Sequence, residues 1–138
     1  MDSCLHYHLL LETPQGELSR SICHLDGIYT QRFNQSHRRN GPLFRGRYKA
    51  VLIDVDEYFL SVACYIHQNP IKAGVVSNMD RYRWSSHQGY LDRKKGPEWL
   101  STEELLSRFR RGSRGAREYQ EYLHGQIEEI VGNGVSGQ

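Results

Sequence analysis

The sequence contains no long apolar run. No stretch approaches the roughly 18 consecutive apolar residues of a membrane-spanning helix, and the first residues, MDSCLH, lack the basic and apolar segments of a secretory signal. The 3 cysteines form no Cys-x-x-Cys pair, which argues against a disulfide framework or a zinc ribbon. We therefore expect a cytoplasmic protein with reduced thiols and no membrane contact.

Acidic residues are missing from one part of the chain. No Asp or Glu occurs from Gly27 to Ile53. Basic clusters favour a polyanionic partner, although a solvated surface explains such a pattern equally well. The basic side chains in this part are Arg32, Arg38, Arg39, Arg45, Arg47 and Lys49, and a second cluster contains Arg108, Arg110, Arg111, Arg114 and Arg117.

The 138 residues suit one domain, and an apolar content of 38% allows only a thin core. A helix is predicted over residues 56–68, with Asp56 as its N-cap. Asn69-Pro70 is predicted to end this helix, because the residue before proline is pushed out of the helical region. Trp84 and Trp99 are predicted to anchor the tail. The apolar spacing predicts strands over residues 6–12 and 47–54 and helices over residues 17–37, 56–68, 101–109 and 115–130.

The first candidate site is the pair His6 and His8. Side chains two apart on a strand point to the same face, so the two imidazoles could chelate one divalent cation. The spacing alone is weak evidence, since such pairs are common by chance.

The second candidate site is on the helix before Asn69-Pro70. Tyr65 and Asn69 are four residues apart and so share one helical face. Asn69 offers an oxygen ligand suited to Mg²⁺ or Mn²⁺, and Tyr65 offers a phenol, a nucleophile toward phosphorus. The alternative is a core tyrosine followed by a capping asparagine.

Five segments, in order, resemble the REP-associated tyrosine transposases, relatives of the HUH single-tyrosine transposases of small insertion sequences. They cover most of residues 6–91. A later stretch, EWLSTEELLSRF with AREYQEYL, is similar to the C-terminal extension of many members. The five segments are HYHLLLETPQGELSRSI, LDGIYTQRFNQSH, GPLFRGRYKAVLID, YIHQNPIKAGVV and YRWSSHQGYL.

The resemblance implies a role for each candidate residue. It makes Tyr65 the catalytic nucleophile, and His6, His8 and Asn69 the ligands of Mg²⁺ or Mn²⁺. The reaction it implies is attack on a DNA phosphodiester, leaving a 5′-phosphotyrosine link and a free 3′-hydroxyl, within the DNA transposition and recombination of a bacterial mobile element.

The resemblance also implies an α+β fold, the ferredoxin-like β-α-β-β-α-β arrangement. This chain begins at the turn after the first β-α-β segment, where Cys4-Leu5 replaces the family's Pro-Asn, so we expect only the two later strands. The missing sheet leaves three outcomes open: a homodimer that shares strands, C-terminal helices that cover the gap, or a decayed remnant. We assign residues 1–91 to the catalytic domain and residues 92–138 to a helical extension.

The partner implied by the resemblance is single-stranded or hairpin DNA. Phosphate contacts are expected from the basic loop, and Phe44 and Tyr48 could stack on bases or belong to the core. A catalytically inactive hairpin-binding remnant is the alternative function, and a small metal-binding or structural domain is a third. The expected DNA-binding side chains are Arg38, Arg39, Arg45, Arg47, Lys49 and Phe44.

Overall fold

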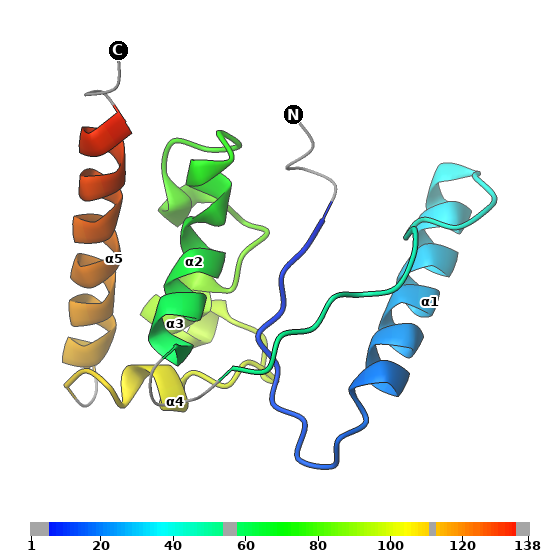
Figure 1. The fold of residues 1–138 in the computed structure, drawn as a ribbon, viewed down its shortest axis with the longest axis horizontal. Helices are drawn as coiled ribbons and strands as arrows, with labels where there is room; N and C mark the ends of the chain where they lie inside the picture. Colours follow the sequence, from blue (N-terminus) through cyan, green and yellow to red (C-terminus); the bar gives the residue numbers. More distant parts are fainter. Residues whose placement is uncertain (1–5, 54–57, 111–112, 135–138) are drawn as a thin grey trace. The chain divides into compact units, whose positions relative to one another are not determined.

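Helices are the only regular secondary structure in residues 6–53, 58–110 and 113–134, the parts of the chain that the computed structural model describes (Figure 1). None of the helices found there is both long and apolar enough to cross a membrane. The elements in order are α1 (Leu18–His37), α2 (Phe59–Lys72), η1 (Met79–Arg81), α3 (His87–Leu91), η2 (Arg93–Lys95), α4 (Glu103–Leu106) and α5 (Ser113–Gly134).

The chain divides into two compact units, one formed by Leu11–Leu52 and the other by Met1–Leu10 with Ile53–Gln138. The smaller unit contains α1, and the chain after α1 folds back along it. The Asn34 side chain donates a hydrogen bond of 2.8 Å to the Gly41 carbonyl near the end of α1. At the start of α1, the hydroxyls of Ser19 and Tyr48 lie 2.6 Å apart. Residues 38–48 therefore run antiparallel to the helix.

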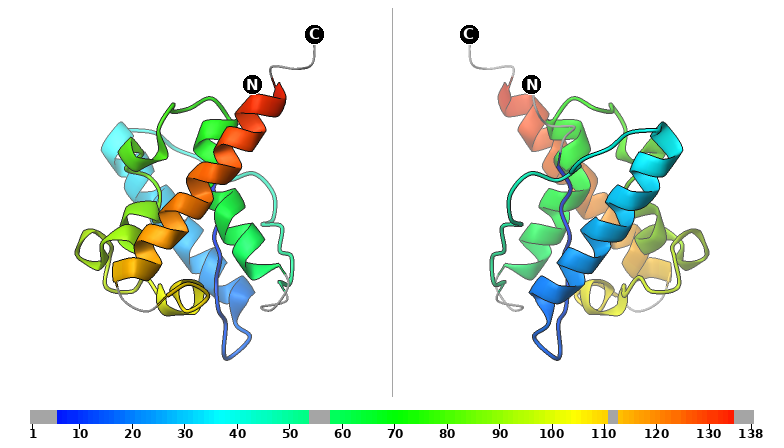
Figure 2. Two further views of the ribbon diagram at one scale, coloured as in Figure 1. Left: turned by 90° about the vertical axis from the view of Figure 1, so that its left-hand side faces the viewer. Right: turned by 90° about the vertical axis from the view of Figure 1, so that its right-hand side faces the viewer.

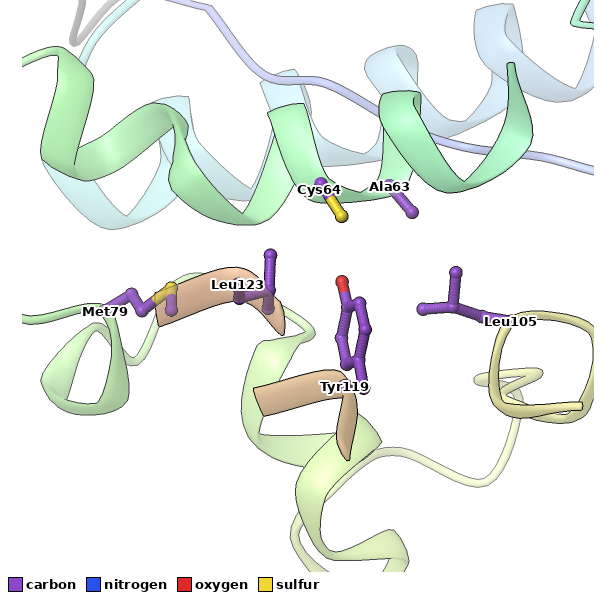
Figure 3. Packing of buried hydrophobic residues seen from close by; sticks show 6 residues of the cluster. All are labelled: Ala63, Cys64, Met79, Leu105, Tyr119 and Leu123. Atoms are coloured by element: carbon purple, nitrogen blue, oxygen red, sulfur yellow. The ribbon is translucent and has the colours of Figure 1, made fainter. Parts of the chain in front are cut away.

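The larger unit is built around a small core that joins α2 to the C-terminal helices. Figure 2 shows α2 and α5 side by side, and these two helices are in contact. Tyr119 and Leu123 of α5 are completely buried and meet Leu105 of α4 (Figure 3). Burying a side chain of this size contributes about 1.5–3 kcal/mol, so these residues hold the C-terminal part of the chain to α2. The buried apolar cluster comprises Ala63, Cys64, Met79, Leu105, Tyr119 and Leu123.

The end of α2 differs from the prediction. The helix does not stop at Asn69 but continues through Pro70 to Lys72. Gly74 ends it, with a left-handed φ of 69°. The Gly74 N–H donates to the Ile71 carbonyl, and the Val75 N–H donates to the Pro70 carbonyl, both at 2.9 Å. This is a Schellman motif, in which the last free carbonyls of a helix are satisfied beyond a glycine.

The predicted α+β fold with two retained strands is wrong. Residues 6–12 and 47–53 run without strand pairing, and no sheet is present in the described part of the chain. A strand exists only when its backbone groups bond to a neighbouring strand, and alternating side chains alone do not supply that neighbour. Cys4, Asp54 and the predicted N-cap Asp56 lie outside the described residues.

Three of the helix predictions can be compared directly with the structure. The helix over 17–37 is confirmed as α1, and that over 115–130 is confirmed within the longer α5. The helix over 101–109 is wrong in extent, because α4 covers only Glu103–Leu106 and has no side-chain cap.

The predicted role of the two tryptophans is also wrong. Trp84 is 74% exposed and Trp99 is 81% exposed, so neither ring anchors the tail. That function belongs to Leu105, Tyr119 and Leu123. The division at residues 91 and 92 stays a prediction.

Candidate functional site

The two N-terminal histidines lie next to one another in the larger unit. Both are exposed, and their ring centroids are 4.9 Å apart with the planes nearly perpendicular. Partial burial, and to a lesser extent His6, lowers the pKa of His8, which favours the neutral imidazole that binds metals. Two imidazoles that each bind one ion at about 2.1 Å have ring centres about 4.5–5.5 Å apart. The observed separation of the centroids, 4.9 Å, falls within this range.

Tyr65 lies beside this pair. Its ring is 45% exposed, and its centroid is 5.5 Å from that of His8 in an edge-to-face arrangement. The structure therefore brings the N-terminal histidines and a solvent-accessible phenol together, although they are far apart in the sequence. A phenol in this position is open to a substrate and adjacent to His6 and His8, the predicted ligands of a cation.

Asn69 follows Tyr65 by four residues on α2 and is partly buried. Residues with this spacing are neighbours on the helix surface, so the amide and the phenol share a face. No three His, Cys, Asp or Glu side chains form a metal-binding group in the described part of the chain. The Asn69 amide oxygen is the further donor that the Tyr65 face offers, and mixed nitrogen and oxygen donors suit a divalent ion.

Lys72 is a member of this site that the sequence reading missed. Its ammonium nitrogen lies 5.4 Å from the centroid of the Tyr65 ring, within the range of a cation–π contact. The signal was present in the spacing, since Lys72 is seven residues after Tyr65 and three after Asn69. It was lost because the helix was predicted to end at Asn69.

The predicted DNA-binding segment belongs to the smaller unit. Phe44 is half-buried, with its ring centroid 6.0 Å from that of Tyr29. Tyr48 is 41% exposed and bonded through its hydroxyl to Ser19. Each ring therefore packs within its own unit and also keeps exposed surface. The charged residues predicted to bind DNA are all exposed: Arg38, Arg39, Arg45, Arg47 and Lys49.

The second basic cluster is partly engaged in the protein. Arg108 lies 3.7 Å from the Glu104 carboxylate and above the Phe59 ring, and Arg110 lies 3.2 Å from Glu118. These two arginines are therefore each engaged by a carboxylate of their own unit. Arg111 lies outside the described residues, and Arg114 and Arg117 are exposed.

Two buried histidines form a further polar cluster in the larger unit. His67 is 2% exposed, and its Nδ1 lies 2.6 Å from the Tyr119 hydroxyl. His87 is fully buried, and its Nε2–H donates to Asp80 at 2.9 Å. Because His67 is two residues from Tyr65, it points away from the Tyr65 face and into the core.

Comparison with family models, with curated proteins and with solved structures finds no match for this chain.

Proposed function

We propose that this protein cleaves and rejoins single-stranded DNA through Tyr65, with a divalent metal ion, as the resemblance to the REP-associated tyrosine transposases implies. One observation carries the proposal: the exposed Tyr65 ring lies 5.5 Å from His8, which in turn lies 4.9 Å from His6. The side chains proposed as nucleophile and ligands, Tyr65, His6 and His8, thus lie next to one another and are open to solvent.

In the proposed reaction the Tyr65 oxygen attacks phosphorus. A bond forms between this oxygen and phosphorus, and the bond from phosphorus to the 3′ oxygen breaks. The phenol proton passes to solvent, and the departing 3′ oxygen takes up a proton from solvent. His6, His8 and Asn69 would hold the Mg²⁺ or Mn²⁺ ion, whose charge offsets that of the phosphate oxygens. The phosphotyrosine conserves the bond energy, so the 3′-hydroxyl can reverse the step.

The exposed basic segment of the smaller unit supports DNA as the substrate. Its residues, from Arg38 to Lys49, include no carboxylate, so a phosphate backbone would meet no repulsive charge there. Contacts of this kind give affinity that falls steeply with salt and that does not depend on sequence. Phe44 adds a partly exposed aromatic ring, and aromatic rings stack on unpaired bases.

An inactive DNA-binding remnant is the second candidate. The observation that favours it is that residues 6–10 form no strand, because a histidine pair on a sheet would be held more rigidly than one on an irregular segment. In this reading the basic segment keeps its role and the chemistry is lost. EDTA would then leave DNA binding unchanged.

The deciding experiment is incubation with a labelled single strand that folds into one hairpin, in the presence of Mn²⁺. We expect a covalent protein–DNA adduct that survives denaturing electrophoresis, that EDTA abolishes, and that Tyr65→Phe reduces below detection. Tyr58→Phe is the matched control, because Tyr58 is 59% exposed and lies just before α2. Equal adduct from Tyr65→Phe would contradict the assignment of the nucleophile, and no adduct from the wild-type protein would favour the remnant.

A further inference from the structure

The continuation of α2 past Pro70 creates a third polar position on the face that carries Tyr65 and Asn69. In a helix, residues separated by four and by seven positions lie along one stripe. Lys72 is seven residues after Tyr65, and it is in α2 only because Gly74, rather than Asn69, ends the helix. One face thus presents a phenol, an amide and an ammonium group.

The contact between Lys72 and Tyr65 is direct. The Lys72 nitrogen lies 5.4 Å from the ring centroid, and both side chains are exposed. No carboxylate pairs with Lys72 among the described residues, whose acid–base pairs involve other side chains. An ammonium group that pairs with none of the described carboxylates and lies beside an accessible phenol is available to an anion that approaches that phenol.

We propose that Lys72 binds the phosphate that Tyr65 attacks. The inference rests on the proposed function and adds a substrate contact to it. The attacking oxygen must approach the phosphorus atom, and the ammonium group lies close enough to the same ring to meet a non-bridging oxygen of that phosphate. A fixed positive charge at that point both holds the strand and stabilises the additional charge of the transition state.

A purely structural role for Lys72 predicts a different set of effects. Lys72 lies in the last turn of α2, where a cation interacts favourably with the helix dipole. On that account, neutralising Lys72 would lower the stability of the helix and leave DNA affinity and its salt dependence unchanged. The two roles are therefore distinguished by DNA binding rather than by folding.

Binding is measured first, on full-length Tyr65→Phe protein, so that cleavage does not interfere. The probe is a fluorescent single strand that folds into one hairpin. We expect Lys72→Met to reduce the slope of log affinity against log salt by about 0.7, the effect of one lost phosphate contact on a single strand, and Lys72→Arg to keep the slope. Lys95→Met is the matched control, because Lys95 is an exposed lysine of η2, and its slope should not change.

Chemistry is measured second, on protein with Tyr65 intact and at saturating DNA. We expect Lys72→Met to slow adduct formation about 100- to 1,000-fold, as for loss of one donor to a developing charge, and Lys72→Arg to restore most of the rate. Thermal unfolding of each variant confirms that the chain is folded. The role of Lys72 would be overturned if the Lys72→Met protein formed the adduct as fast as the wild type. It would also be overturned if Lys95→Met lowered the slope of log affinity against log salt as much as Lys72→Met does. The absence of any adduct from the wild-type protein would instead overturn the proposed function.

Discussion

Adjacent side chains on α2 lie in opposite environments, which separates chemistry from packing. Tyr65 is 45% exposed, whereas Cys64 is 2% exposed and faces the hydroxyl of Tyr119 in the core (Figure 3). Successive residues on a helix point about 100° apart, so one helix can present a phenol to solvent and a thiol to the core. The two described cysteines, Cys64 and Cys23, differ in the same way, since Cys23 is exposed on α1.

This difference predicts selective alkylation. Burial raises the pKa of the Cys64 thiol to about 11, against smaller opposing effects of Tyr119 and Lys72, and only a thiolate reacts. In a folded Cys4→Ser protein we expect iodoacetamide to modify Cys23, and to modify Cys64 at least about 100-fold more slowly than a cysteine of ordinary pKa. Peptide mass spectrometry measures both sites, and denaturant should remove the protection. Rapid labelling of Cys64 in the folded state would contradict its placement in the core.

At the scale of the element, the end of α2 depends on one glycine. Gly74 has a φ of 69°, in the left-handed region, and the two hydrogen bonds of the Schellman motif form around it. A glycine adopts this conformation without cost, whereas other L-residues are strained there by about 1–2 kcal/mol. Lys72 lies two residues before this glycine, in the last turn of α2.

We accordingly expect Gly74→Ala and Gly125→Ala to have opposite effects. Gly74→Ala should lower the free energy of unfolding by about 1 kcal/mol, because the new methyl group meets no atom but forces a strained φ. Gly125 is within α5, has no positive φ and is equally uncrowded, so Gly125→Ala should raise that free energy by up to about 1 kcal/mol. Urea titration of both variants measures this. A stabilising Gly74→Ala would show that the helix does not end as described.

The sequence was most informative where a structure is local. The spacing of Leu18, Ile22 and Leu25 predicts α1, because a helix makes its own backbone hydrogen bonds. The prediction of strands over residues 6–12 and 47–54 failed, because a strand needs a neighbouring strand, which the alternation of side chains cannot supply. The site follows the same division. Tyr65 and Asn69 could be paired from their spacing, but the approach of His8 to Tyr65 is a long-range contact, and Lys72 required the continuation of the helix through Pro70.

At the scale of the whole molecule, a buried polar network links α2, α3, η1 and α5 within the larger unit. His67 joins Tyr119 and Ser86, at 2.6 Å and 3.1 Å, and its ring centroid is 5.4 Å from that of His87. His87 donates to Asp80, while its Nδ1 meets no hydrogen-bond partner among the described residues. A proton on Nδ1 would be a buried donor without an acceptor, and such groups are costly. The network therefore keeps His87 neutral, and burial disfavours the charged form of both imidazoles.

This preference for neutral imidazoles makes folding sensitive to acid. Burial, with a smaller contribution from His87, lowers the pKa of His67 from 6.5 to about 3. The same direction holds for His87, where burial outweighs the opposing effect of Asp80. Between pH 6.5 and 3 the unfolded chain binds a proton at His67 that the folded chain excludes. The free energy of unfolding therefore loses nothing to this histidine well above pH 6.5. Below pH 6.5 it falls by about 1.4 kcal/mol for each pH unit because of His67.

The test compares the free energy of unfolding at pH 7.5 and pH 5.5 in the wild type and in His67→Gln. We expect the wild type to lose about 1.4 kcal/mol more than the variant, because one unit below 6.5 is one unit of excluded protonation. His24→Gln serves as the control, since His24 is exposed on α1, and it should keep the acid sensitivity of the wild type. NMR titration of the His67 ring gives the same answer without a substitution: a ring that protonates near pH 6.5 in the folded protein would show that His67 is not in this network.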